Sequence, residues 1–120
     1  NGKEIKTFEN KFGKNAVVIC EDLWNSKTLS KLDELNPDNI FVLANSPTRG
    51  FQNGKILIAE QWYSILQTTS IITKSNIIFI NRVGFDDGLG FWGGSAIFQN
   101  GQLVYQLPFF DEVQKDIFIN

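Results

Sequence analysis

Three short apolar runs dominate the hydrophobic pattern along this chain of 120 residues. They are Ala16–Cys20, Ile40–Ala44 and Ile77–Ile80, and none of them has a polar face. Continuous apolar runs of this length are typical of strands that are covered on both sides of a sheet. We therefore expect three buried strands.

Two segments between these runs have apolar residues at helical spacing. The first, Ser26–Asn36, places three leucines on one face, offers Ser26 as an N-cap and is followed by Pro37. The second, Lys55–Thr73, carries Trp62 and several isoleucines on one face. Both segments predict helices, and Trp62 is assigned to the core.

The remaining segments predict turns and short antiparallel strands. Polar, glycine-punctuated composition predicts an edge strand or hairpin within Asn1–Lys14 and loops at Arg49–Asn53 and Val83–Gly94. Asn100-Gly101 is the strongest two-residue hairpin signal and separates two short apolar stretches. The strands expected in this part of the chain are Ser95–Gln99, Gln102–Gln106 and Asp116–Asn120.

The order of these elements predicts an α/β fold with a mixed sheet and two covering helices. Strand and helix alternate through residue 80, and antiparallel strands follow. The two helices can cover only one face of the sheet. Since strands without a polar face need cover on both sides, we expect the second face to meet another structure, such as a second sheet.

Composition and charge exclude several classes of function. A hydrophobic fraction of 42% is that of a globular domain, and a net charge of −2 with scattered lysines gives no basic patch for nucleic acid. The apolar runs are far too short to span a membrane. One cysteine and no histidine leave no internal disulfide, no Cys–His or Ser–His pair and little for a zinc site. This cysteine content is compatible with a reducing, cytoplasmic setting.

Cys20 ends the first apolar run and is followed by an acidic pair, Glu21-Asp22. Ligand sites in α/β sheets gather at the carboxyl ends of strands, so a thiol there can act as a nucleophile, with the N–H of Glu21 directed at a developing oxyanion. The alternative is a small core side chain, because unpaired cysteines are commonly buried. Acidic neighbours raise a thiol pKa, so a nucleophilic Cys20 needs a nearby cation.

Two further segments contain side chains that suit a site. Asn81-Arg82 follows the third apolar run, either as site residues or as loop residues that form ion pairs. Phe91-Trp92 precedes Gly93-Gly94, and paired glycines allow close backbone approach. The spacing alone leaves both readings open.

Taken in order, these motifs resemble the C-terminal half of a nitrilase-superfamily (carbon–nitrogen hydrolase) domain. The order is AVVICEDLW, a strand ending in Asn-Ser-Pro, a helix with Trp62, IIFINRVG, FWGGS and an Asn-Gly hairpin, and it covers about residues 1–112. The Cys-Glu-Asp-Leu-Trp run is most similar to the amidase branch and to the glutaminase domains of glutamine-dependent NAD synthetases. The resemblance implies that residues 1–120 are a partial domain, the C-terminal half of an α-β-β-α sandwich.

The same resemblance implies a mechanism that uses a Glu, a Lys and a Cys. Cys20 would attack an amide or nitrile carbon and form a thioester. The N–H of Glu21 and the family's Lys would stabilise the tetrahedral intermediate, and the family's Glu would act as general base and acid. The resemblance also implies candidates for the substrate pocket or its surroundings, which are Asn45, Asn81, Arg82, Phe91 and Trp92.

The family's Glu and Lys have no counterparts in this chain. Both precede the cysteine strand by far more than the 19 residues present here, so none of the lysines and glutamates near the start matches them. These residues are Lys3, Glu4, Lys6, Glu9, Lys11 and Lys14. The chain also carries Ile72-Thr73 where many members have a Glu-Asn pair.

We interpret the chain as a fragment of a cysteine-dependent hydrolase that cleaves a linear amide, nitrile or carbamoyl C–N bond and is inactive alone. The alternatives are a glutaminase domain that supplies ammonia to a synthetase and a non-catalytic interaction or dimerisation module. We expect a small-molecule amide or nitrile substrate, a homo-oligomer, no nucleic-acid or membrane partner, no metal and no organic cofactor. In this family the substrate is selected by pocket loops, several of which lie N-terminal to the segment seen here.

Overall fold

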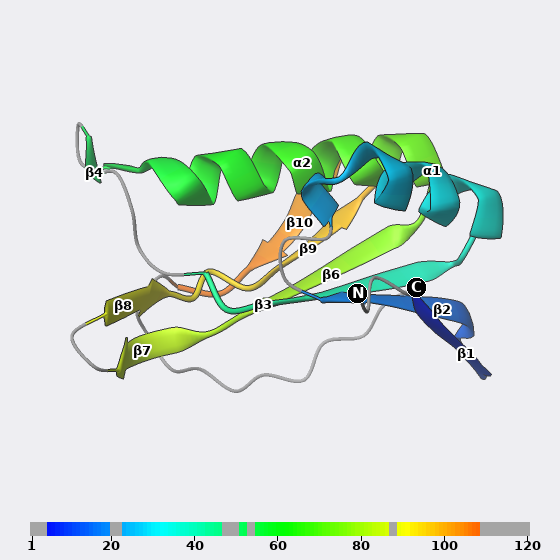
Figure 1. The fold of residues 1–120 in the computed structure, drawn as a ribbon, viewed down its shortest axis with the longest axis horizontal. Helices are drawn as coiled ribbons and strands as arrows, with labels where there is room; N and C mark the ends of the chain where they lie inside the picture. Colours follow the sequence, from blue (N-terminus) through cyan, green and yellow to red (C-terminus); the bar gives the residue numbers. More distant parts are fainter. Residues whose placement is uncertain (1–4, 20–22, 47–50, 53–54, 87–88, 109–120) are drawn as a thin grey trace.

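The computed structural model of the chain describes residues 5–19, 23–46, 51–52, 55–86 and 89–108. These residues form two layers, a six-stranded sheet and two helices that both lie on one face of it (Figure 1). The predicted α/β class with a mixed sheet and two covering helices is confirmed.

The six-stranded sheet has the order β1-β2-β3-β6-β9-β10. Strands β2, β3 and β6 are parallel, and β1, β9 and β10 are antiparallel to their neighbours. The strands are β1 (Lys6–Asn10), β2 (Gly13–Ile19), β3 (Asn39–Ala44), β6 (Asn76–Asn81), β9 (Ala96–Gln99) and β10 (Gln102–Gln106).

Two helices connect the parallel strands. Helix α1 (Ser26–Leu35) joins β2 to β3, and α2 (Leu57–Thr73) joins β3 to β6. Both connections step across the sheet in the same direction, so crossovers of one hand place both helices on the same face. Because β2, β3 and β6 are parallel, their carboxyl ends lie together at one edge of the sheet.

The core lies between the helices and the sheet. Alternate residues of the strands point to the helices and are almost fully buried, and Trp62 is 2% exposed, as its spacing on α2 predicted. The sheet contributes Ala16, Val18, Ile40, Val42, Ile77, Phe79, Ala96 and Phe98, and the helical layer contributes Leu23, Leu32, Ala59, Trp62 and Leu66.

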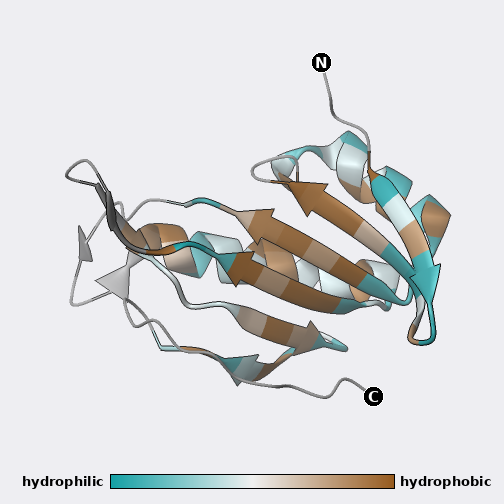
Figure 2. Cartoon of the chain, turned by 90° about the horizontal axis from the view of Figure 1, so that it is seen from below, coloured by the Kyte–Doolittle hydropathy of each residue, from teal (hydrophilic) through white to brown (hydrophobic). Residues whose placement is uncertain are grey.

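The opposite face of the sheet is apolar and has no covering layer among the described residues (Figure 2). Ile19, Leu43 and Ile80 lie on it and are 55%, 38% and 46% exposed. The ring of Phe8 stacks over that of Phe41 at its edge, with centroids 6.4 Å apart. This face is here called the open face. Its exposure agrees with the expectation that the two helices cover one face of the sheet and that the other face is left for another structure to cover.

Three asparagines form a hydrogen-bonded ladder at the amino ends of the parallel strands. Asn15, Asn39 and Asn76 are register partners on β2, β3 and β6. The Asn76 amide donates to Asn39 Oδ1 at 2.9 Å, and the Asn39 amide donates to Asn15 Oδ1 at 2.9 Å. Since a shift by one residue would break both bonds, the ladder specifies the register of the strands.

Several predicted boundaries differ from those of the structure. Helix α2 begins at Leu57 and not at Lys55, because Lys55–Ile56 form a short strand, β5, that pairs with β4 (Phe51–Gln52). The N-cap of α1 is Asn25 and not Ser26, since the Asn25 side chain accepts the N–H of Lys27.

The predicted loop at Val83–Gly94 is wrong for most of its length. It contains β7 (Val83–Asp86) and β8 (Leu89–Trp92), which pair antiparallel. The glycines favoured a loop, but two of them, Gly84 and Gly90, lie opposite Phe91 and Phe85, and the strand pairing satisfies the backbone of both segments.

The Asn100-Gly101 hairpin joins β9 and β10 as predicted, with both residues at positive φ. Of the loop predicted at Arg49–Asn53, the described residues Phe51–Gln52 instead form β4 by pairing with β5. The rest of that loop and the strand predicted at Asp116–Asn120 lie outside the described residues.

Candidate functional site

The sequence predicts a functional site at the carboxyl edge of the parallel strands. Ile19, the last residue of β2, is the register partner of Leu43 on β3, and Ala44 is the partner of Asn81 at the end of β6. Cys20 and Glu21 lie outside the described residues, and Cys20 follows Ile19 directly in the chain. The described part of the edge is therefore formed by the ends of β3 and β6 and by the segment after β8.

Asn81 is the centre of a hydrogen-bond network at this edge. It is 6% exposed. Its Oδ1 accepts the backbone N–H of Ser46 at 2.9 Å, and its Nδ2 donates to the carbonyl oxygen of Gly93 at 3.0 Å. One side-chain amide thus satisfies a donor from the end of β3 and an acceptor from the segment after β8.

Trp92 also belongs to this hydrogen-bond network, through Ser46. Its indole Nε1–H donates to Ser46 Oγ at 3.0 Å, and both residues are buried. Ser95 Oγ accepts the backbone N–H of Asn81 at 3.0 Å. The group formed by Ser46, Asn81, Trp92 and Ser95 is here called the edge network.

Backbone hydrogen bonds connect the same segments. The N–H of Arg82 donates to Ala44 O at 3.2 Å, and the N–H of Gly93 donates to Arg82 O at 3.0 Å. Gly93 has φ +68, and a Cβ at this position would lie 3.0 Å from Cγ2 of Val83. A side chain at position 93 would therefore strain the turn that brings its carbonyl to Asn81.

Aromatic packing joins the edge network to helix α2. The Trp92 ring lies 5.7 Å from that of Phe79 and 6.0 Å from that of Tyr63, centroid to centroid. The Tyr63 hydroxyl donates to the carbonyl oxygen of Gly94. Burial raises the pKa of Tyr63 above its usual range, so the hydroxyl stays protonated and continues to donate.

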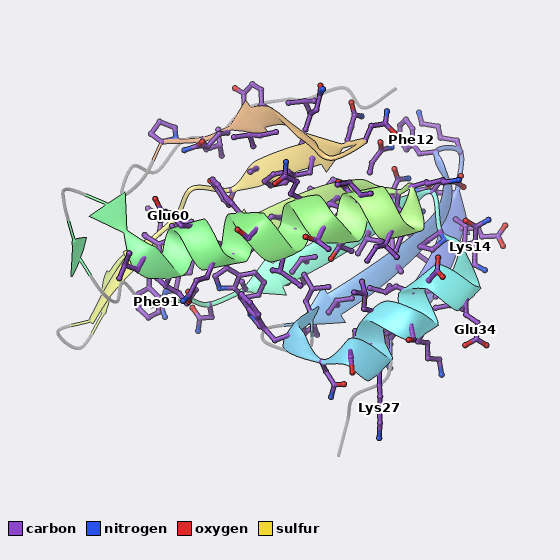
Figure 3. All side chains as sticks on the ribbon, turned by 90° about the horizontal axis from the view of Figure 1, so that it is seen from above. Phe12, Lys14, Lys27, Glu34, Glu60 and Phe91 are labelled. Atoms are coloured by element: carbon purple, nitrogen blue, oxygen red, sulfur yellow. The ribbon has the colours of Figure 1, made fainter. Side chains whose placement is uncertain are left out.

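Arg82 and Phe91 contact each other beside this network. The Arg82 guanidinium carbon lies 4.3 Å from the centroid of the Phe91 ring, which is the geometry of a cation–π contact. Phe91 is 5% exposed and lies at the end of the molecule where α2 begins (Figure 3). Arg82 is exposed, so its charge remains at the surface while the aromatic ring is covered.

The structure thus separates the five predicted pocket residues into three groups. Asn81 and Trp92 meet at Ser46, Arg82 and Phe91 contact each other, and Asn45 is exposed next to Ser46 in the chain. The roles of Ser46, Ser95 and Tyr63 were missed. The Asn-Ser-Pro motif drew attention to Ser46 only as the end of a strand, and no local pattern indicated the other two.

A hollow of about 390 Å³ lies on the open face beside the edge network. Its lining is mostly apolar and comes from β6, β9, β10 and the segments after β8 and β10, with Ile78, Ile80, Ile97, Tyr105 and Pro108 among its residues. Asn81 also borders it. The side-chain amide of Asn81 is bonded to Ser46 and Gly93, so this hollow has little polar chemistry of its own.

The described residues contain neither a membrane-spanning helix nor a group of metal-binding side chains. None of their helices combines the length and the apolar content needed to cross a membrane. No three of their acidic or cysteine side chains gather where they could hold a metal ion.

Both the sequence and the fold of the chain are similar to those of known proteins. No family model matches the sequence. The chain is 32% identical over 112 residues to a glutamine-dependent NAD(+) synthetase from Acinetobacter baylyi. This match covers 92% of the chain and 20% of that protein. The chain therefore spans about one fifth of the length of this relative.

Solved structures have the same fold. The glutamine-dependent NAD+ synthetase of Acinetobacter baumannii matches with a TM-score of 0.80 and 32% identity, over 94% of this chain and 20% of that one. The nitrilase-superfamily amidase of Nesterenkonia sp. AN1 matches with a TM-score of 0.73 and 14% identity, over 90% of this chain and 38% of that one. The predicted resemblance is confirmed: the chain has the fold of part of a glutamine-dependent NAD+ synthetase and of part of a nitrilase-superfamily amidase.

Proposed function

We propose that this chain supplies the nucleophile strand of a cysteine-dependent carbon–nitrogen hydrolase and that Cys20 is the nucleophile. The observation that carries the proposal is that β2, whose last residue Ile19 directly precedes Cys20 in the chain, ends at the same edge as β3 and β6, where the edge network holds the strand ends. Active sites of α/β sheets gather at such edges. The fold similarity to an amidase whose active-site cysteine carries a covalently added acetamide moiety supports the same assignment.

The proposed reaction has two steps. The Cys20 thiolate attacks the amide carbon, and the tetrahedral intermediate collapses with cleavage of the C–N bond, so that ammonia leaves with one added proton and a thioester remains on Sγ. Water then attacks the thioester, giving a carboxylic acid and the free thiol. The backbone N–H of Glu21 stabilises the oxyanion in both steps.

The general base and the cation that this reaction needs come from outside the chain. The family's Glu and Lys have no counterparts in the sequence of this chain, and Lys14, for instance, donates to the carbonyl oxygen of Leu35 at the opposite end of the sheet. The open face supports the same view, because an apolar sheet face of this kind requires a second layer. We propose that the rest of the domain provides the second sheet, the Glu and the Lys.

Glutamine is the amide substrate that the comparisons favour. Both NAD synthetases reported above are glutamine-dependent and are 32% identical to this chain, against 14% for the amidase. In the proposed reaction glutamine would give glutamate and ammonia, and the ammonia would serve a synthetase reaction elsewhere in the parent protein.

A second candidate function is a non-catalytic module that associates through the open face. The exposed side chains of Ile19, Leu43 and Ile80 favour it, since a face of this kind drives association when it is left uncovered. Under this alternative the parent protein would form homo-oligomers through this surface and Cys20 would have no chemical role.

Ammonia release from glutamine by the full-length protein tests the proposal. We expect turnover by the parent protein, none by its Cys20→Ala variant and none by the isolated chain of 120 residues. Full turnover by Cys20→Ala would exclude Cys20 as the nucleophile. Turnover by the isolated chain that depends on Cys20 would instead show that the missing Glu and Lys are not needed.

A further inference from the structure

We infer that Asn81 is a positioning residue for the proposed hydrolysis, which fixes the segments after β3 and after β8 relative to each other so that substrate is bound in one geometry. The inference rests on the proposed function and concerns substrate binding rather than the nucleophile. The family resemblance gives Asn81 only as a candidate for the substrate pocket or its surroundings and names no positioning role for it.

The contacts of Asn81 reach two separate segments of the chain. Its Oδ1 holds the N–H of Ser46, 35 residues earlier, and its Nδ2 holds the carbonyl of Gly93, 12 residues later. Its own backbone N–H is held by Ser95 Oγ. A single side chain at the end of β6 thus sets the relative position of two segments that have no hydrogen bond between their backbones in the described network.

The amide of Asn81 meets two demands at once in this space. The position needs an acceptor for Ser46 and a donor for Gly93, and Asn carries both on one short side chain. At 6% exposure, water cannot easily replace either bond. An alanine would leave a buried N–H and a buried carbonyl without partners, and both segments would move to find new ones.

The indole of Trp92 adds a second hydrogen bond to Ser46, beside the one that Asn81 makes. Ser46 is held at its N–H by Asn81 and at its Oγ by Trp92, while Gly93 next to Trp92 is held by Asn81. Ser46 is therefore held at a fixed position at the end of β3. The same holds for the exposed Asn45 that precedes it.

None of these bonds reaches β2, which carries Ile19 immediately before Cys20. Loss of Asn81 should therefore loosen the part of the site that holds substrate and leave the nucleophile strand in place. In kinetic terms this is a loss of binding that is shared by the ground state and the transition state, which raises KM and preserves kcat.

Asn76 offers a matched control on the same strand. It is an asparagine with a side-chain hydrogen bond, to Asn39 at 2.9 Å, but it begins β6 at the opposite end of the sheet. Asn76→Ala removes an equivalent bond and should lower stability without changing KM or kcat. A purely structural role for Asn81 would make the two variants behave alike.

The experiment measures kcat and KM for ammonia release from glutamine in the full-length protein and its Asn81→Ala, Ser46→Ala, Asn76→Ala and Cys20→Ala variants. We expect Asn81→Ala to raise KM about tenfold with kcat within about threefold of the parent value. Ser46→Ala, which removes only the acceptor of Trp92, should raise KM by about threefold. Asn76→Ala should leave both constants unchanged.

The possible outcomes separate the two claims. If Cys20→Ala abolishes turnover but Asn81→Ala matches Asn76→Ala in KM, or lowers kcat alone, the positioning role is overturned and the nucleophile stands. If Asn81→Ala does not fold, an unchanged KM for Ser46→Ala overturns the inference and a raised one supports it. If the parent releases no ammonia, or Cys20→Ala remains active, the proposed function fails and the inference falls with it.

Discussion

The side chain of Asn81 accepts the backbone N–H of Ser46 at 2.9 Å and so joins the end of β6 to the end of β3. Both residues are buried at the edge where the parallel strands β2, β3 and β6 finish. This relationship gives the carboxyl edge a fixed shape before any ligand is considered. It also means that the described part of the site is held by tertiary hydrogen bonds rather than by one loop alone.

The asparagine ladder at the other end of the sheet should be important for stability. Asn39→Ala removes the middle member and leaves the Asn76 donor and the Asn15 acceptor without their partners. We expect it to lower the free energy of unfolding by about 1–3 kcal/mol, measured by urea unfolding with tryptophan fluorescence. Lys31→Ala, at an exposed position of α1, should change it by less than about 0.5 kcal/mol. Equal effects of the two substitutions would show that the ladder contributes nothing.

Much of the fold could be predicted because it follows from local pattern. Three apolar runs without a polar face gave β2, β3 and β6, and Asn100-Gly101 gave the hairpin of β9 and β10. The β7–β8 pair could not be found in this way, because its glycine-rich segments have low strand propensity and become strands only by pairing with each other.

The site could be predicted only in part for a related reason. Position at strand ends identified Asn81 and Trp92, but their shared partner Ser46 is 35 and 46 residues away along the chain. Contacts over such distances depend on the register of β3 and β6, which no local spacing encodes. The roles of Cys20 and Glu21 remain predictions, since both lie outside the described residues.

In the full-length protein the open face should behave as an interior surface. Leu43→Lys places a charge on this face, and a second layer would leave that charge buried and unpaired. We expect the free energy of unfolding to fall by about 3 kcal/mol or more. Ile72→Lys is the matched control, because Ile72 is 44% exposed on α2 and Leu43 is 38% exposed on the sheet. A Leu43→Lys protein as stable as the control would contradict the presence of a second layer.

In the isolated chain the same substitution should have a different effect. Without a second layer, the open face is expected to drive self-association of the 120-residue chain, which sedimentation velocity can follow. Leu43→Lys should shift the distribution towards monomer because lysine repels its counterpart on another copy, whereas Ile72→Lys on the helical side should not. If the unsubstituted 120-residue chain is a monomer at the same concentration, the open face does not drive association.

The hydroxyl of Tyr63 should give a pH dependence at the alkaline side. Burial raises its pKa in the folded state, so above about pH 10 the unfolded chain loses a proton that the folded chain keeps, and the free energy of unfolding falls. Tyr63→Phe lacks this proton and the bond to Gly94. We expect the variant to be less stable by about 1 kcal/mol near neutral pH and the difference to shrink as the pH rises above about 10. A difference that is constant with pH would show that Tyr63 ionises equally in both states.

Acid quenching of the full-length protein during turnover of glutamine, followed by mass spectrometry of the peptide that contains Cys20, tests the central claim most directly. The account predicts a glutamyl thioester on Cys20 that is absent from Cys20→Ala and from samples without glutamine. Turnover of glutamine with an unmodified Cys20 peptide, or with the acyl group on another residue, would contradict it.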